Sequence, residues 1–309
     1  MKKLFKTTLI SLLFLCFVNN VVFSKTFKDF KEDDVRFGDL KVDSKLTLKF
    51  PPGDWIVGSR DRWSWGPLIQ NITTFVQIEK KNVSKVIEIY QFTASGLWGS
   101  DVNLFIEQDT FYENIEGYGC TKYKGNSLLE FYKKGSAHNC LRVRHVDVQR
   151  HLYNPPKQWQ KTASAPFRAW MKRNDYTIPD LLLWSWHSYF ARTQAGKWTT
   201  VSFVEDPSHY GAKKKYISDR YNSEFHPDRI NKFPEVKKIM DRFVKKSIER
   251  QKILEKAYKI PKRHVLKFSN ITSVNSNNLA DDLKKLSDLY NKGALTKEEY
   301  EKAKKNLLK

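Results

Sequence analysis

Arg60, Arg62, Trp63 and Trp65 follow one another in one short segment, residues 59–68. An aromatic face beside a guanidinium group can hold a sugar ring, a lipid headgroup or a base against a positive charge. The segment has no regular hydrophobic period, so we expect a loop, and long loops often carry function. We therefore predict that these four residues form a ligand-binding rim. The alternative is that the tryptophans cap the core while the arginines face water.

Residues that could act as general acids or bases are scattered along the chain: His145, His151, His187, and His209 with Asp206. The sequence contains no nucleophile elbow, phosphate-binding loop, dinucleotide fingerprint or His-Glu-x-x-His motif. We therefore expect a binding protein without a cofactor rather than an enzyme. An envelope hydrolase acting on glycan or lipid is the alternative, and it would need a cleft in which an Asp or Glu faces a histidine.

The first 24 residues have the pattern of a secretory signal. Three lysines precede an apolar run at residues 7–18, and Val22 and Ser24 suit the positions just before a cleavage site. The apolar run is short for a membrane-spanning helix. We predict cleavage near Ser24 and export to the periplasm or the medium; an uncleaved anchor is the alternative.

Cys120 and Cys140 are the two cysteines that remain after such cleavage. Two thiols in an exported chain are most simply joined in a disulfide, which would stabilise the fold by about 3 kcal/mol. A zinc site that adds His138 and His145 to these cysteines is the alternative. The spacing fits no familiar zinc pattern, so we expect no metal.

The chain is strongly basic, with 55 Lys and Arg against 34 Asp and Glu. The signal contains three of these lysines, so the mature chain carries 52 − 34 = +18. Such a charge attracts anionic partners. Outside the cytoplasm these are lipid headgroups, acidic glycans or an envelope protein. Nucleic acid is a further alternative, but export argues against it. A solvated lysine surface without a ligand would give the same composition.

The body that positions these residues is predicted to be mainly antiparallel sheet. Apolar and polar residues alternate in 46–50, 72–79, 85–92, 140–148 and 198–204, with turn residues between several of these segments. One long helix is predicted to begin at Pro234, with apolar residues at helical spacing as far as Tyr258. Packing this helix across the sheet gives an α+β fold. The segments 149–179 and 208–232 lack either period, and we expect loops there.

The last thirty residues predict two short amphipathic helices joined by a glycine turn. Apolar residues recur at helical spacing before Gly293, and Thr296 stands three residues before Glu299 as in a capping box. A pair of helices this small buries too little apolar surface to be stable alone. We expect its apolar stripe to mediate self-association: Leu283, Leu286, Leu289, Tyr300, Leu307 and Leu308.

This terminal pattern resembles the SHOCT (short C-terminal domain) family, on the strength of the stretch KGALTKEEYEKAKKNLL and the spaced leucines before it. The resemblance implies an accessory module with roles in self-association or nucleic-acid contact, and it covers about a tenth of the chain. The predicted organisation is a signal at 1–24, an α+β body at 25–262, a polar linker at 263–277 and a SHOCT-like tethered hairpin at 278–309. The predicted function is binding of an anionic envelope component or a protein partner.

Overall fold

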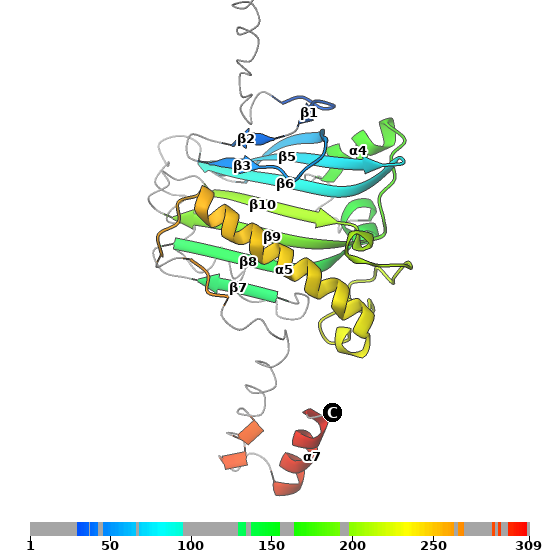
Figure 1. Cartoon of the computed structure of the whole chain (residues 1–309), viewed down its shortest axis with the longest axis vertical. Coiled ribbons are helices and arrows are strands. Elements are labelled where there is room, and N and C mark those ends of the chain that lie inside the picture. The colour runs from blue at the N-terminus through cyan, green and yellow to red at the C-terminus, as the bar shows by residue number, and fades with distance from the viewer. Residues whose placement is uncertain are drawn as a thin grey trace, which may run out of the picture.

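The chain forms an α+β structure in which antiparallel sheet predominates (Figure 1). The computed structural model describes residues 30–36, 38–42, 46–65, 68–94, 129–133, 137–154, 164–191, 198–262, 265–268, 286–287, 290–291 and 296–307. The strands are β1 (Val35–Arg36), β2 (Asp39–Lys41), β3 (Thr47–Lys49), β4 (Trp55–Trp65), β5 (Leu68–Glu79), β6 (Asn82–Ala94), β7 (Leu129–Lys133), β8 (Ala137–Asp147), β9 (Leu181–Ala191) and β10 (Trp198–Glu205). The helices are η2 (Gln149–Tyr153), α4 (Ser164–Arg173), η5 (Pro207–Tyr210), η6 (Ile230–Lys232), α5 (Pro234–Ala257) and α7 (Lys297–Leu307).

The described strands make an eight-stranded sheet in the order β1-β4-β5-β6-β10-β9-β8-β7, and β2 and β3 form a separate pair. On one side of the sheet β4, β5 and β6 pair in chain order, and on the other side β7, β8, β9 and β10 do. The two sets join where β10 pairs with β6. The tight turn between β5 and β6 has positive φ at both Lys80 and Lys81. Such a turn matches the right-handed twist of the strands it connects, so it sets their register.

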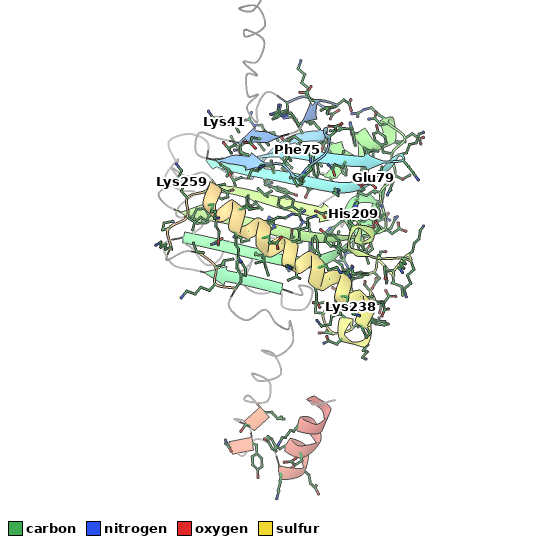
Figure 2. The ribbon with its side chains drawn as sticks, in the orientation of Figure 1. Lys41, Phe75, Glu79, His209, Lys238 and Lys259 are labelled. Atoms are coloured by element: carbon green, nitrogen blue, oxygen red, sulfur yellow. The ribbon has the colours of Figure 1, made fainter. Side chains whose placement is uncertain are left out.

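One face of the sheet is covered by α5, which crosses it diagonally in Figure 1. Pro234 occupies the first turn of this helix, where its missing N–H is not needed. The apolar stripe that follows is buried between helix and sheet: Val236, Ile239, Met240, Phe243, Val244, Ile248 and Leu254. On the sheet side most of this stripe packs against Leu141 and Val143 of β8 and Leu181 and Leu183 of β9. Phe75, labelled in Figure 2, belongs to a neighbouring cluster that includes Ile87, Val201 and Phe203 and that Leu254 joins. This burial against α5 is the main hydrophobic core.

The opposite face carries a second core at one end of the sheet, formed by α4 and η2. Phe167 and Trp170 of α4 stack with ring centroids 5.9 Å apart and pack over Gly58 of β4. A Cβ at Gly58 would lie 3.1 Å from Phe167 and 3.2 Å from Trp170, so any other residue would have to push these rings back by a few tenths of an ångström. Gly58 is also where the register of β4 against β5 shifts by a bulge.

The predicted sheet and long helix are confirmed, whereas the loop expected at residues 59–68 is wrong. β4 runs to Trp65 and β5 begins at Leu68. The segment 149–179 likewise contains η2 and α4, whereas 208–232 is irregular apart from short 3-10 turns. The polar residues of β4 hid the strand, because charged side chains at its exposed positions replaced the apolar alternation that we had sought.

The C-terminal residues that are described show the predicted helix start. Thr296 Oγ1 accepts the N–H of Glu299 at 3.3 Å, and Glu299 Oε2 accepts the N–H of Thr296 at 2.9 Å. These reciprocal bonds make a capping box at the start of α7. The rings of Tyr290 and Tyr300 stack 4.8 Å apart, which joins the helical residues 290–291 to α7.

Several predictions fall outside the described residues. They concern the signal at 1–24, Cys120, most of the linker at 263–277, and Leu283, Leu289 and Leu308 of the apolar stripe. Leu286 is half-buried and Leu307 lies in α7. Within the part of the chain that is described, no helix is long and apolar enough to cross a membrane.

Candidate anion-binding site

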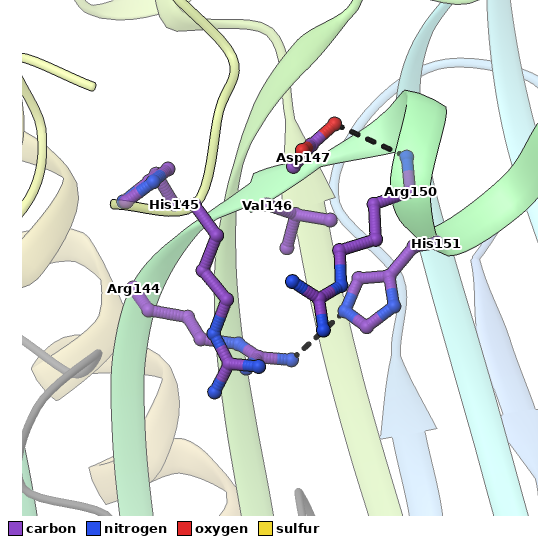
Figure 3. Close-up of a pocket in the computed structure, with 7 residues that line it drawn as sticks. Arg144, His145, Val146, Asp147, Arg150 and His151 are labelled. Carbon is purple, nitrogen blue, oxygen red and sulfur yellow. Dashed lines mark hydrogen bonds between the residues drawn. The ribbon is translucent and has the colours of Figure 1, made fainter. Parts of the chain in front are cut away.

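A pocket lies at the end of β8, beyond the last described pair that this strand makes with β7. The described pairing with β7 stops at Leu129 opposite Val143, while β8 itself continues to Asp147. The chain then turns into η2, and the irregular segment 213–229 passes beside it. We call this the arginine pocket (Figure 3); its lining is Arg144, His145, Val146, Asp147, Arg150, His151 and Arg220.

Strand alternation sends successive residues of β8 to opposite faces of the sheet. Arg144 pairs with Trp184 of β9, and His145 pairs with Leu183. The Arg144 guanidinium carbon lies 4.4 Å from the centre of the Trp184 ring, which in turn stacks on Trp186 at 6.1 Å. A cation over an aromatic face is attracted to it, so this stack holds the Arg144 side chain in place.

The turn into η2 brings Arg150 and His151 to the same pocket. Asp147 Oδ1 accepts the N–H of Arg150 at 3.1 Å, and Val148 donates its N–H to the carbonyl oxygen of Asp180 at 2.9 Å. Arg144 Nη2 lies 3.2 Å from His151 Nε2 (Figure 3). Because a guanidinium only donates, Nε2 is the acceptor, and the proton of the neutral ring is on Nδ1.

Arg220 enters the pocket from the segment 213–229. Asp219 Oδ1 accepts the N–H groups of Tyr221 at 2.9 Å and Asn222 at 2.7 Å. These two bonds lower the pKa of the Asp219 carboxyl and fix the turn from which Arg220 projects. The third arginine is therefore placed by a local turn rather than by the sheet.

Both histidines of the pocket are neutral at pH 7. Burial, and then the positive charges of Arg144, Arg220 and Arg150, lower the pKa of His151 to about 3. Burial likewise lowers the pKa of His145 to about 4, with Arg144 adding to the effect and the Asp219 backbone opposing it. His145 is only 5% exposed, and the Asp219 backbone is the hydrogen-bonding group beside its ring.

The pocket is an electropositive site. Three arginines and one aspartate give +3 − 1 = +2 for the lining at neutral pH. Guanidinium groups bind carboxylate and phosphate oxygens through charge-assisted hydrogen bonds. Among the residues that the structure describes, no group of three or more His, Cys, Asp or Glu could hold a metal ion. The chemistry on offer is anion binding.

The four residues predicted from the sequence as a binding rim lie elsewhere, on β4. Arg60 and Arg62 are exposed, and Arg60 Nη1 donates to the carbonyl oxygen of Phe30 at 2.6 Å. The side chains of Trp63 and Trp65 are outside the described part of the structure. Four strands separate β4 from β8, which places the two regions roughly 24 Å apart at the usual strand spacing. The predicted rim and the arginine pocket are therefore separate surfaces.

The structure brings together two of the histidines that the sequence had offered as acid–base candidates, His145 and His151, and Asp147 lines the same pocket. His209 instead lies near Glu79 (Figure 2), with Nε2 and Oε1 3.9 Å apart, and Asp206 Oδ1 accepts the N–H of Ser208. The arginines of the pocket were missed. The segment RVRHVDVQRH, residues 142–151, contains two of them, and its density of basic residues at a strand end was the available signal.

A second charged cluster lies under α5 at the end of β10. Glu205 is 2% exposed and accepts hydrogen bonds from Tyr210 and Arg250, and Lys246 Nζ lies 3.1 Å from its Oε2. Burial would raise the pKa of the Glu205 carboxyl, but Arg250 and Lys246 outweigh burial and lower it to about 2. We call this the Glu205 cluster. It ties α5 to the sheet.

A third group of buried polar residues is arranged like the serine–histidine pair of a hydrolase. His187 Nε2 lies 3.0 Å from Ser185 Oγ, and His187 Nδ1 lies 2.9 Å from Gln251 Oε1. All three residues are at most 2% exposed between the sheet and α5. Burial lowers the pKa of His187 to about 3, so it is a poor base for proton transfer at neutral pH. This arrangement is a buried hydrogen-bond network that a substrate does not reach in this structure.

Comparison with family models identifies the C-terminal segment. Residues 281–308 match the family described as "Short C-terminal domain" (SHOCT), and no other family was found for the body. The chain therefore carries a SHOCT domain at its C-terminus, as the sequence pattern predicted. Comparison with curated proteins and comparison with solved structures each find no match to the chain.

Proposed function

We propose that this protein is exported and binds an anionic component of the cell envelope at the arginine pocket, without catalysing a reaction on it. The observation that carries the proposal is a pocket lined by three arginines, Arg144, Arg150 and Arg220, with a single aspartate. The +18 charge expected of the mature chain would speed the arrival of an anionic ligand.

The first test compares the arginine pocket with the rim predicted on β4. Arg150→Gln with Arg220→Gln, and Arg60→Gln with Arg62→Gln, each remove two positive charges from the full chain. Cosedimentation with phosphatidylcholine vesicles that contain phosphatidic acid measures binding. We expect the pocket variant to bind at least about tenfold more weakly and the β4 variant to bind nearly as wild type. Equal losses would mean a diffuse charge effect, and a loss confined to the β4 variant would move the site to the rim.

The alternative functions make different demands on the same residues. A hydrolase needs a group that exchanges protons near pH 7, whereas the pKa values of about 4 and about 3 for His145 and His151 keep both rings neutral. Nucleic-acid binding would weaken steeply with salt. A titration with double-stranded DNA at two salt concentrations separates this alternative from a pocket that holds one small anion.

Export and the disulfide belong to the same proposal. Cys140 is fully buried on β8, opposite Ser188 of β9. We propose that it is joined to Cys120 after the signal is removed near Ser24. Intact-mass measurement without reductant would find two hydrogens missing and a new N-terminus near Lys25. Two thiols that alkylate in the native protein would refute the bond.

We further propose that the SHOCT domain is a tethered helical hairpin that mediates self-association. The capping box at Thr296 and the Tyr290–Tyr300 stack support a hairpin. Leu266 packs in the core against α5, and its N–H donates to Glu255, so a truncation after Phe268 spares the body. Light scattering should find the full chain associated and the truncated chain monomeric. If both the full and the truncated chains are monomeric, the hairpin either packs on its own body or has no partner.

A further inference from the structure

We propose that the exposed side of α5 is a docking surface that lays the protein against an anionic lipid bilayer. Six exposed residues of the helix form this surface, which we call the basic ridge: Lys238, Arg242, Lys245, Glu249, Lys252 and Lys256. The inference goes beyond the proposed function, because none of these residues lines the arginine pocket.

The basic ridge follows from the spacing of charge along α5. Its residues recur every three or four positions, which places them above one another on one side of the helix. The apolar stripe of the same helix occupies the other side and is buried against the sheet. In Figure 2, Lys238 and Lys259 mark the two ends of the helix. At 1.5 Å per residue the ridge is about 27 Å long.

The charges of the ridge are not neutralised within the described part of the protein. Lys238, Lys245 and Lys256 form no ion pair or hydrogen bond with a residue that the structure describes. Beside the ridge, by contrast, Lys237 pairs with Asp241 at 2.9 Å. The five basic residues and the one acidic residue of the ridge give +5 − 1 = +4. This charge is available to a partner.

A row of lysines suits a partner whose anionic groups can move. Lysine carries a compact charge on a flexible stem, so it does not fix the direction of its ligand. The six residues of the ridge include no aromatic side chain on which a base could stack. The headgroups of a bilayer can gather beneath such a row, and each Lys or Arg near an anionic membrane strengthens binding about fivefold.

One exposed apolar residue adjoins the ridge. Ile253 is 58% exposed and lies four residues after Glu249 and three before Lys256 on the same helix. An apolar side chain beside a basic row can enter the boundary between the headgroups and the acyl chains of a bilayer. The phosphate backbone of a nucleic acid offers it no apolar surroundings. Ile253 therefore favours a lipid partner.

Cosedimentation of the full chain with vesicles of phosphatidylcholine and phosphatidylglycerol tests the inference. Lys245→Gln with Lys256→Gln should weaken binding at least about tenfold, and Glu249→Gln should strengthen it about fivefold. Glutamine has nearly the helix propensity of lysine, so the helix is kept. Lys80→Gln with Lys172→Gln is the matched control, because it removes two positive charges from exposed residues outside α5. It should bind nearly as wild type.

Ile253→Ser separates a lipid partner from a nucleic acid. It should weaken vesicle binding severalfold and leave binding to double-stranded DNA unchanged. Ridge variants that bind the vesicles as wild type, or a control variant that loses as much as the ridge variant, would overturn the inference. So would a chain that binds DNA through Lys245 and Lys256 but does not bind the vesicles. Circular dichroism confirms that each variant is folded.

The two kinds of vesicle keep this inference apart from the proposed function. If the Arg150/Arg220 variant loses phosphatidic acid vesicles while the ridge variant binds both kinds as wild type does, the pocket assignment stands and the ridge inference is wrong. If the ridge variant loses both kinds and the Arg150/Arg220 variant loses neither, the ridge inference stands and the pocket assignment is wrong. Losses in both variants would support both.

Discussion

The Glu205 cluster and the arginine pocket are both built from basic side chains beside the sheet, but they are organised in opposite ways. In the Glu205 cluster a buried carboxylate is the centre, and Arg250, Lys246 and Tyr210 converge on it. In the arginine pocket the guanidinium groups surround an open space, and the one carboxylate of the lining, Asp147, accepts a backbone N–H.

This difference separates a structural use of charge from a functional one. A buried ion pair that loses one partner leaves an uncompensated charge in a poorly solvated place, which is costly. Arg150 is exposed and Arg220 is half-buried, so water already solvates much of their charge. Removing them should cost little stability while removing the site. The following predictions use stability to test that distinction, from the largest effect to the smallest.

Glu205→Gln should destabilise the protein by about 3–5 kcal/mol, because Arg250 stays buried without its carboxylate. Urea unfolding at pH 7 measures the change. Asp241→Asn is the control, since it breaks the partly exposed Lys237–Asp241 pair on the same helix and should cost less than about 1 kcal/mol. Equal effects in the two variants would show that the Glu205 cluster is no more structural than a surface pair.

The pH dependence of stability should reveal the buried histidine under α5. The pKa of His187 is about 3 in the folded chain against an ordinary value of 6.5, so the unfolded chain binds more protons between these values. Above pH 6.5 the His187 ring is neutral in both the folded and the unfolded chain, so it does not change the free energy of unfolding with pH. Below pH 6.5 the unfolded chain binds a proton that the folded chain does not, and the free energy of unfolding falls by about 1.4 kcal/mol per pH unit until the folded pKa is reached. Unfolding at pH 7.5, 6 and 5 should give a shallower slope for His187→Gln. An identical slope would contradict the assignment.

Arg150→Gln with Arg220→Gln should change the free energy of unfolding by no more than about 0.5 kcal/mol. Adding phosphate should raise the melting temperature of the wild type and leave that of the variant unchanged, because a ligand stabilises only the state that binds it. Thermal unfolding with and without phosphate measures both effects. A variant as unstable as Glu205→Gln would make the pocket arginines structural.

The sequence predicts the repetitive parts of this fold and the local parts of the tail. Alternation located β5, β6 and β10, helical spacing located α5 from Pro234, and a three-residue offset located the capping box at Thr296. The part of β4 from Ser59 onward was missed because Arg60 and Arg62 occupy exposed strand positions that carry no apolar signal. Local periodicity identifies elements only where one face is apolar.

The arginine pocket could be predicted only in part. Arg144, His145, Arg150 and His151 are close in sequence, at a predicted strand end. Arg220 is distant in the chain and reaches the pocket only because its segment passes beside β8. The Glu205 cluster has the same limitation, since Glu205 and Arg250 meet when α5 packs across the sheet. Sequence spacing does not contain such contacts.

The most direct test of the central claim is the NMR response of the histidine rings to inorganic phosphate. His145 and His151 line the arginine pocket, whereas His187 is sealed under α5 in the same protein. We predict that phosphate shifts the ring nitrogen signals of His145 and His151 and leaves those of His187 in place. Pocket signals that do not move, or signals of all three rings that move alike, would contradict the account.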